Sequence, residues 1–343
     1  MKRSVALLCS LALPVVGLSL TGCGGNDSAD DPNTLVVYTA RSEALNNAVI
    51  PQFEKETGIK VEVVTAGTGE LIKRVKSEGD HPLGDVLWAA DETMLSSQKD
   101  MFEKYTSPED ANMPAEFKNK SGYFTPAFAD PTVMVVNKGL AGSMQIKSFA
   151  DLLNPELKGK IAFGDPVNSS SAFQVLMAML YTAGNGDPMS KAAWDYVDKF
   201  LANLDGKIAN SSSQVYKGVA NGEYVVGLTW EDPAANLVKS GADVEVVFPA
   251  EGAIFPGESV QIIKGAAHLD NAKKFVDFMI NEETQNRVGE TTTVRPLRTG
   301  AKLADYMTPT DKIKLVANYD EAWVAENKAA ITEKYSEHRT DAK

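Results

Sequence analysis

Residues 34–65 read TLVVYTARSEALNNAVIPQFEKETGIKVEVVT, and this stretch decides the predicted fold. It opens with an apolar run, Thr34–Tyr38, and closes with a second one, Lys60–Thr65. Between them, Ser42–Thr57 has apolar residues at helical spacing, and Gly58 follows where a left-handed residue commonly ends a helix. A strand, a helix and a strand in succession predict an α/β fold with a mostly parallel sheet.

The same alternation continues toward both ends of the remaining chain. Because 343 residues exceed the size at which one hydrophobic core stops growing, we expect two lobes. Further strands are predicted at Asp85–Ala89, Thr132–Asn137, Lys160–Phe163, Tyr224–Thr229, Val244–Val247 and Ser259–Ile263. Further helices are predicted at Glu70–Glu78, Ala172–Thr182, Lys191–Asn203, Gln214–Ala220 and Asp270–Ile280, with a helical region from about Asp311 to Tyr335.

The N-terminus has the pattern of an export signal. Lys2 and Arg3 precede the mostly apolar run Ala6–Leu20, which is too short to span a membrane comfortably. The run ends in Leu-Thr-Gly-Cys at Cys23, which resembles the bacterial lipoprotein box, where cleavage precedes a lipidated cysteine. We therefore predict a signal peptide at 1–22 and lipidation at Cys23. An ordinary secretory signal with a chance cysteine is the alternative.

The cysteine count and the charge exclude several classes of function. The chain has 2 Cys, Cys9 and Cys23, so the mature domain lacks a disulfide, a cysteine metal site and a thiol nucleophile. Residues 23–33 are small, polar and acidic, as in a disordered tether. With Lys2 and Arg3 removed, the formal net charge of −12 becomes −14, which disfavours nucleic acid as a partner.

Four turns rich in hydroxyl groups or glycine lie after predicted strands or directly before predicted helices. They are Tyr38–Ser42, Ala66–Gly69, Asn168–Ser171 and Asn210–Ser213. Helix N-termini carry unpaired N–H groups and bind anions, and such turns lie where open α/β sheets bind ligands. One such turn alone is explained as a helix cap, but two Asn-Ser-Ser-Ser stretches exceed what a cap needs.

A second feature is the stretch GLTWED, residues 227–232, where an apolar strand ends in two carboxylates. On a strand these side chains would point to opposite faces, unlike a catalytic carboxylate pair. A solvated turn is the alternative to a ligand contact. The full set of predicted ligand-binding residues is Thr39, Ala40, Arg41, Gly67, Thr68, Asp91, Ser169, Ser170, Ser171, Ser212, Ser213, Trp230, Glu231, Asp232 and Arg295.

Motifs of catalysis are missing from the sequence. The 3 His are His81, His268 and His338, far apart and in polar or loop contexts, so a zinc or catalytic histidine site is not expected. The chain has no G-x-S-x-G elbow and no P-loop. We therefore predict no catalytic residue, no metal and no cofactor. A phosphate-ester hydrolase would need a base or metal cluster that the sequence does not supply.

In order and spacing, several segments resemble the family 1 extracellular solute-binding proteins of ABC importers. The resemblance is closest to the branch with ferric-ion, thiamine, 2-aminoethylphosphonate and hexose-phosphate binding members. It is carried by Leu35–Ala40, Phe53–Val61, Ala89–Asp91, Gly159–Pro166 with Ser169–Ala172, Gly227–Asp232 and Ala272–Phe278. It implies a monomer of the type II periplasmic-binding fold, exported and lipid-anchored at the cell envelope, that closes on a solute and serves an ABC permease of the inner membrane.

In that fold, two α/β lobes are joined by crossing hinge strands, expected here near Phe128–Val133 and Ile254–Ser259. The resemblance then divides the chain into an N-terminal lobe at 34–128 plus 260–310, a C-terminal lobe at 129–259 and a C-terminal helical segment at 311–343.

The resemblance also bears on the ligand. Ferric-binding members end the strand at the GLTWED position with two adjacent tyrosines, but none of the 10 Tyr here are neighbours. The phosphonate and sugar-phosphate members are more similar. The resemblance therefore implies a small anionic organophosphorus solute, with the serine turns and Arg41 on its phosphorus group and Glu231 or Asp232 accepting hydrogen bonds from hydroxyls or an ammonium. A ferric-ion-binding protein and a sensor lipoprotein of the same fold remain alternatives.

Overall fold

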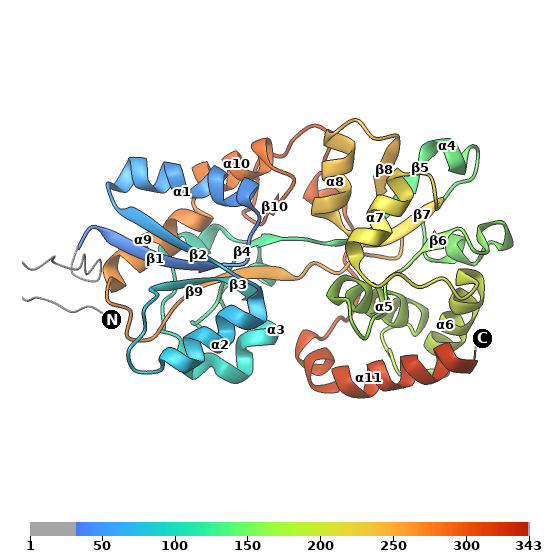
Figure 1. The fold of residues 1–343 in the computed structure, drawn as a ribbon, viewed down its shortest axis with the longest axis horizontal. Coiled ribbons are helices and arrows are strands. Elements are labelled where there is room, and N and C mark those ends of the chain that lie inside the picture. The colour runs from blue at the N-terminus through green and yellow to red at the C-terminus, as the bar shows by residue number, and fades with distance from the viewer. Residues whose placement is uncertain (1–31, 342–343) are drawn as a thin grey trace, which may run out of the picture.

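The computed structural model describes residues 32–341 and consists of two lobes joined by crossing segments (Figure 1). The predicted signal peptide, Cys23 and most of the tether lie outside the described residues. Among the described residues, no helix is long and apolar enough to cross a membrane. The first lobe opens with β1 (Thr34–Thr39), α1 (Glu43–Thr57), β2 (Lys60–Thr65), α2 (Thr68–Glu78), β3 (Val86–Asp91), α3 (Glu92–Leu95) and β4 (Thr125–Ala129).

After the first crossing the chain builds the second lobe and then returns. The second lobe holds β5 (Thr132–Asn137), α4 (Lys138–Ala141), β6 (Ile161–Ala162), α5 (Ser170–Ala183), α6 (Lys191–Leu204), α7 (Ser212–Ala220), β7 (Val226–Trp230), α8 (Glu231–Lys239) and β8 (Val244–Val247). The returning chain forms β9 (Gly257–Ile262), α9 (Leu269–Ile280), α10 (Glu282–Thr291) and β10 (Arg295–Pro296), and α11 (Glu321–Asp341) follows.

Each lobe is organised on one sheet. The first sheet has the order β10-β4-β9-β3-β1-β2, and the second has the order β6-β7-β5-β8. The two sheets are mixed, so the expectation of mostly parallel pairing is wrong. β1 pairs in parallel with β2 and β3, but β9 runs antiparallel to both of its neighbours because it re-enters the first lobe after the second crossing.

The helix boundaries of the opening stretch follow the sequence. Ser42 caps α1 by accepting a hydrogen bond from the Leu45 N–H, and Gly58 ends the helix with a φ of 72°. Leu45, Val49 and Phe53 are buried against the sheet, where Phe53 meets Phe275 edge to face. The amphipathic spacing that predicted α1 is therefore what docks it on the first lobe.

The C-terminal region differs from the prediction of a helix over about 311–335. Residues 313–316 are not helical, because this segment is extended beside the second crossing: the Ala253 N–H donates to the Lys314 carbonyl (2.9 Å) and the Val316 N–H to the Ala253 carbonyl (3.1 Å). The helix begins only at Glu321 and continues to Asp341. It packs on the second lobe, where Val324, Ile331 and Tyr335 are buried.

Candidate functional site

The predicted turns gather where the two lobes face each other. In the first sheet, Asp91 at the end of β3 pairs with Glu258 at the start of β9, beside the second crossing. In the second sheet, Trp230 at the end of β7 pairs with Thr132, directly after the first crossing. Strands parallel to β3 and β7 end on the same edges, so the turns after β1, β2 and β6 also face the junction (Figure 1).

In the first lobe, the turn after β1 is held by its own side chains. The buried Thr39 accepts a hydrogen bond from the Arg41 N–H through Oγ1 (3.0 Å). The Arg41 guanidinium forms an ion pair with Glu258, so the cation is turned toward β9. Gly67 caps α2 without a side-chain hydrogen bond, and Thr68 is the first residue of that helix.

In the second lobe, the two serine turns have the same geometry. Ser169 caps α5 and Ser211 caps α7, each accepting a hydrogen bond from the N–H three residues later. The cap hydroxyl also lies 3.0 Å from a second serine hydroxyl, Ser171 in one turn and Ser213 in the other. Two of the three serines of each turn therefore have a local structural role, which leaves the exposed Ser170 and the half-buried Ser212 beside each helix N-terminus.

The two carboxylates of GLTWED lie at the start of a helix and not on the strand, which corrects the prediction of opposite faces. β7 ends at Trp230, which is half-buried, and Glu231 and Asp232 form the first turn of α8. Pro233 suits this position because the first turn of a helix has unpaired N–H groups in any case. Glu231 is only 2% exposed, so the solvated-turn alternative is wrong for this residue.

Glu231 forms a buried, bidentate ion pair with Arg295 across the two lobes. The Arg295 Nε lies 2.7 Å from Glu231 Oε2, and Nη2 lies 2.5 Å from Oε1. Arg295 is 0% exposed, and its Nη1 donates to Thr310 Oγ1 at 2.8 Å. The structure therefore brings two predicted ligand residues together, but on each other. This pair joins α8 of the second lobe to β10 of the first.

Asp232 lines a small cavity at the junction of the two lobes. The cavity has a volume of about 170 Å³, and it is lined by Ala40, Arg41, Ser42, Leu45, Asp130, Asp232, Glu258 and Val294. Three of these side chains are carboxylates and one is a cation, which is already paired with Glu258. Asp130 lies in the first crossing, and its Oδ1 accepts the Asp232 N–H at 2.8 Å. The cavity therefore carries net negative charge.

Burial and neighbouring carboxylates raise the pKa of two cavity acids, Asp130 and Asp232. Burial raises the pKa of Asp130 well above its usual value, and the nearby Asp232 charge raises it further, with smaller effects of Glu258 and Glu231. Burial also raises the pKa of Asp232, while the hydrogen bond from Thr293 opposes the rise. A positive group in the cavity would relieve this repulsion, whereas a phosphate there would increase it.

The raised pKa of Asp130 predicts a pH effect on the ligand-free protein. Between the unfolded value of 3.8 and the raised folded value, the native state binds more protons, so this group's stabilising contribution is lost as pH rises. We expect Asp130→Asn, which keeps the acceptor for the Asp232 N–H, to melt above the wild type at pH 8. The gain should shrink toward pH 4. Melting curves at stepped pH test this, and a gain independent of pH would contradict it.

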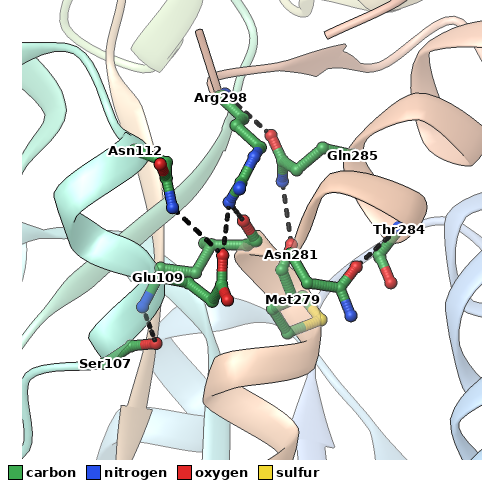
Figure 2. A network of polar contacts seen from close by, with 9 residues as sticks. Ser107, Glu109, Asn112, Met279, Asn281, Thr284, Gln285 and Arg298 are labelled. Carbon is green, nitrogen blue, oxygen red and sulfur yellow. Dashed lines mark hydrogen bonds and ion pairs between the residues drawn. The ribbon is translucent and has the colours of Figure 1, made fainter.

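The neighbouring Arg298 has a structural role. Its Nη1 bonds Glu109 Oε2 (2.7 Å) and the Ile280 carbonyl (2.8 Å), and Gln285 Oε1 accepts its backbone N–H (Figure 2). Gln285 is 0% exposed and also donates to the Ala127 and Met279 carbonyls. This network fixes the segment that carries Arg295.

The sequence-based prediction missed the two other acidic residues of the cavity, Asp130 and Glu258. Both lie in or beside crossings, where the sequence shows only isolated acids, DP and GES. The signal that could have found them is their position at the expected hinge. Within residues 32–341, no cluster of His, Cys, Asp and Glu has the geometry to hold a metal ion.

The chain is similar to known proteins of one family. The family model of bacterial extracellular solute-binding proteins matches residues 48–315. The chain belongs to this family. The spermidine/putrescine-binding periplasmic protein of Escherichia coli is 27% identical over 274 residues, which cover 77% of this solute-binding protein and 77% of that one. Iron uptake protein A1 of Synechocystis is 26% identical over 312 residues, 84% of each chain.

The fold is also that of solved periplasmic binding proteins. The structure of AfuA from Actinobacillus pleuropneumoniae, with exogenous fructose-6-phosphate bound, has a TM-score of 0.71 at 23% identity over 90% of this chain and 98% of that one. The predicted family resemblance and the type II fold are therefore confirmed. Proteins of this family work outside the cytoplasm as the binding components of ABC importers, so this chain binds a solute and is not an enzyme.

Proposed function

We propose that this solute-binding protein captures a small zwitterionic organophosphorus compound, an amine with a phosphonate or phosphate group, between its lobes. The observation that carries the proposal is the acidic cavity of Asp130, Asp232 and Glu258, in which the one cation, Arg41, is already paired with Glu258. An ammonium group would donate charge-assisted hydrogen bonds to these carboxylates and offset their mutual repulsion. A sugar hydroxyl would donate hydrogen bonds to the same carboxylates without that electrostatic gain.

The phosphorus group would bind at the serine turns of the second lobe. The N-termini of α5 and α7 offer backbone N–H groups, and Ser170 and Ser212 offer hydroxyls. The acidic cavity is lined by residues of both lobes, and the serine turns lie at the same junction. One molecule with opposite charges at its two ends would then contact both lobes. Closure would then be favoured only when both ends are occupied.

Similar proteins support the amine end and the phosphorus end of the proposed ligand separately. The Escherichia coli relative binds polyamines by its name, which supports an amine end. The AfuA structure has fructose-6-phosphate bound on the same fold, which supports a phosphorus end. The ferric-ion alternative is favoured by the name of the Synechocystis relative.

Three further parts of the proposal concern the whole protein. Cys23 would carry lipid that anchors a monomer to the envelope, and the acidic residues after it would act as the tether. The bound solute would pass to an ABC permease of the inner membrane. The lobes would comprise 34–128 with 260–310 and 129–259, and 311–343 would strap them together, because residues 313–316 lie along the second crossing and α11 packs on the second lobe.

A thermal-shift panel tests the proposal. The panel contains 2-aminoethylphosphonate, ethylphosphonate, inorganic phosphate, putrescine, glucose 6-phosphate, thiamine and ferric citrate. A ligand at 100 times its dissociation constant should stabilise the protein by about 2.7 kcal/mol, a shift of several degrees. We expect 2-aminoethylphosphonate to give the largest shift. A shift by ferric citrate alone would replace the proposal with the iron alternative.

A further inference from the structure

The C-terminal helix α11 contacts α5 and the loop that precedes α5. Its buried positions Val324, Ile331 and Tyr335 are seven and four residues apart, which puts them on one face of the helix, and this face docks on the second lobe. Lys328 lies over the ring of Phe173, which is in the first turns of α5, at 5.0 Å from the ring centre. Figure 1 shows α11 running along α5 and α6.

The last turns of α11 reach the loop that holds the turn. The Arg339 Nη1 lies 2.7 Å from Asp165 Oδ2, and the two side chains are 33% and 13% exposed. Asp165 lies three residues after β6, and its other carboxylate oxygen, Oδ1, accepts the Val167 N–H at 3.0 Å. The Asp165 carboxylate therefore joins the C-terminal helix to the loop between β6 and α5.

Asp165 also organises the serine turn through its backbone. Its carbonyl accepts the Asn168 N–H at 3.0 Å and the Ser169 N–H at 2.8 Å. Ser169 in turn caps α5, and its hydroxyl lies 3.0 Å from that of Ser171. The position of Asp165 therefore sets the position of the cap and of the N–H groups at the helix start.

We propose that Arg339 is a positioning residue for the solute: by holding Asp165, it fixes the Asn168–Ser171 turn in the geometry that receives the phosphorus group. It does not touch the solute itself. This inference rests on the proposed function, because it assigns the phosphorus group to this turn. It also gives the C-terminal helix a role in affinity in addition to its role in packing.

The test begins with hydrogen exchange of the ligand-free protein, which does not depend on knowing the ligand. We compare Arg339→Ala with Arg339→Lys and with the matched control Lys334→Ala, which removes another cation of α11, one that lies 4.7 Å over Trp194. Losing a charge-assisted hydrogen bond should speed exchange of the Val167, Asn168 and Ser169 amides by roughly tenfold in Arg339→Ala. Arg339→Lys should largely restore the slow exchange.

The second readout is affinity for 2-aminoethylphosphonate by calorimetry. We expect Arg339→Ala to bind about tenfold more weakly and Lys334→Ala to bind like the wild type. Unchanged exchange at 167–169 in Arg339→Ala would overturn the positioning role, and so would an equal effect of Lys334→Ala. Altered exchange with unchanged affinity would place the phosphorus group elsewhere. If the wild type does not bind this compound, the proposed function fails, while the exchange data still decide whether Arg339 holds the turn.

Discussion

Arg295→Ala is expected to lower the free energy of unfolding by about 3–5 kcal/mol, the cost of breaking a buried ion pair from one side. The variant leaves the Glu231 carboxylate, which is 2% exposed, without its bidentate partner. Glu231→Ala should cost a similar amount, because it leaves the fully buried guanidinium of Arg295 unpaired. Urea unfolding monitored by tryptophan fluorescence measures both.

The controls separate burial from charge loss. Lys191→Ala removes an exposed pair with Asp195 on α6 and should cost about 0.3–0.5 kcal/mol. The double change Glu231→Leu with Arg295→Met should be much closer to the wild type than either single alanine variant, because no charge is left buried. A loss of stability in Arg295→Ala no larger than in Lys191→Ala would contradict a buried inter-lobe pair.

This result matters for any binding test. Because Glu231 supports the junction of the lobes, loss of binding in Glu231→Ala would not distinguish a ligand contact from a weakened structure. Asp232 and Asp130 are better positions for such a test, because both line the cavity and asparagine keeps an acceptor at each position, for the Thr293 hydroxyl and for the Asp232 N–H.

Asp232→Asn is expected to weaken binding of 2-aminoethylphosphonate by about 10- to 100-fold, since a hydrogen bond to a charged group contributes about 1.5–3 kcal/mol. The asparagine keeps an acceptor for the Thr293 hydroxyl, so the free protein should be little changed. Binding of ethylphosphonate, which has no amine, should be weak in the wild type and unaffected by the substitution. Calorimetric titration gives both constants.

The matched control is Asp243→Asn, which removes a carboxylate that is 70% exposed on the second lobe and paired with Lys138. It should leave both constants unchanged at physiological salt, because exposed charges are screened over about 8 Å. Equal weakening by Asp243→Asn would mean that overall charge, and not the cavity, attracts the amine. Unchanged affinity in Asp232→Asn would remove the amine from this cavity.

The fold was accessible from the sequence where local signals agree. In the opening stretch, apolar periodicity, the Ser42 cap and the Gly58 end all point to the same helix, and α1 has those bounds. The helix expected from about Asp311 begins only at Glu321, because tertiary hydrogen bonds to Ala253 hold residues 313–316 extended. The strand β4 was missed because its five buried residues include a proline and precede the crossing directly.

The site was accessible only in part. Cap chemistry located the serine turns, since caps are local, and the structure explains two serines in each by their mutual hydrogen bonds. The Glu231–Arg295 pair could not be predicted, because 64 residues separate its partners and no local pattern joins them. Asp130 and Glu258 were missed for the same reason: the cavity exists only once the two crossings lie side by side.

A paired calorimetric titration of the wild-type protein with 2-aminoethylphosphonate and with ethylphosphonate tests whether the acidic cavity binds an amine. The two compounds share the phosphorus group and differ in the amine. We expect the amine compound to bind at least tenfold more tightly, as for one charge-assisted hydrogen bond at the acidic cavity. Equal binding of the two compounds, or tighter binding of ethylphosphonate, would mean that the acidic cavity does not bind an amine.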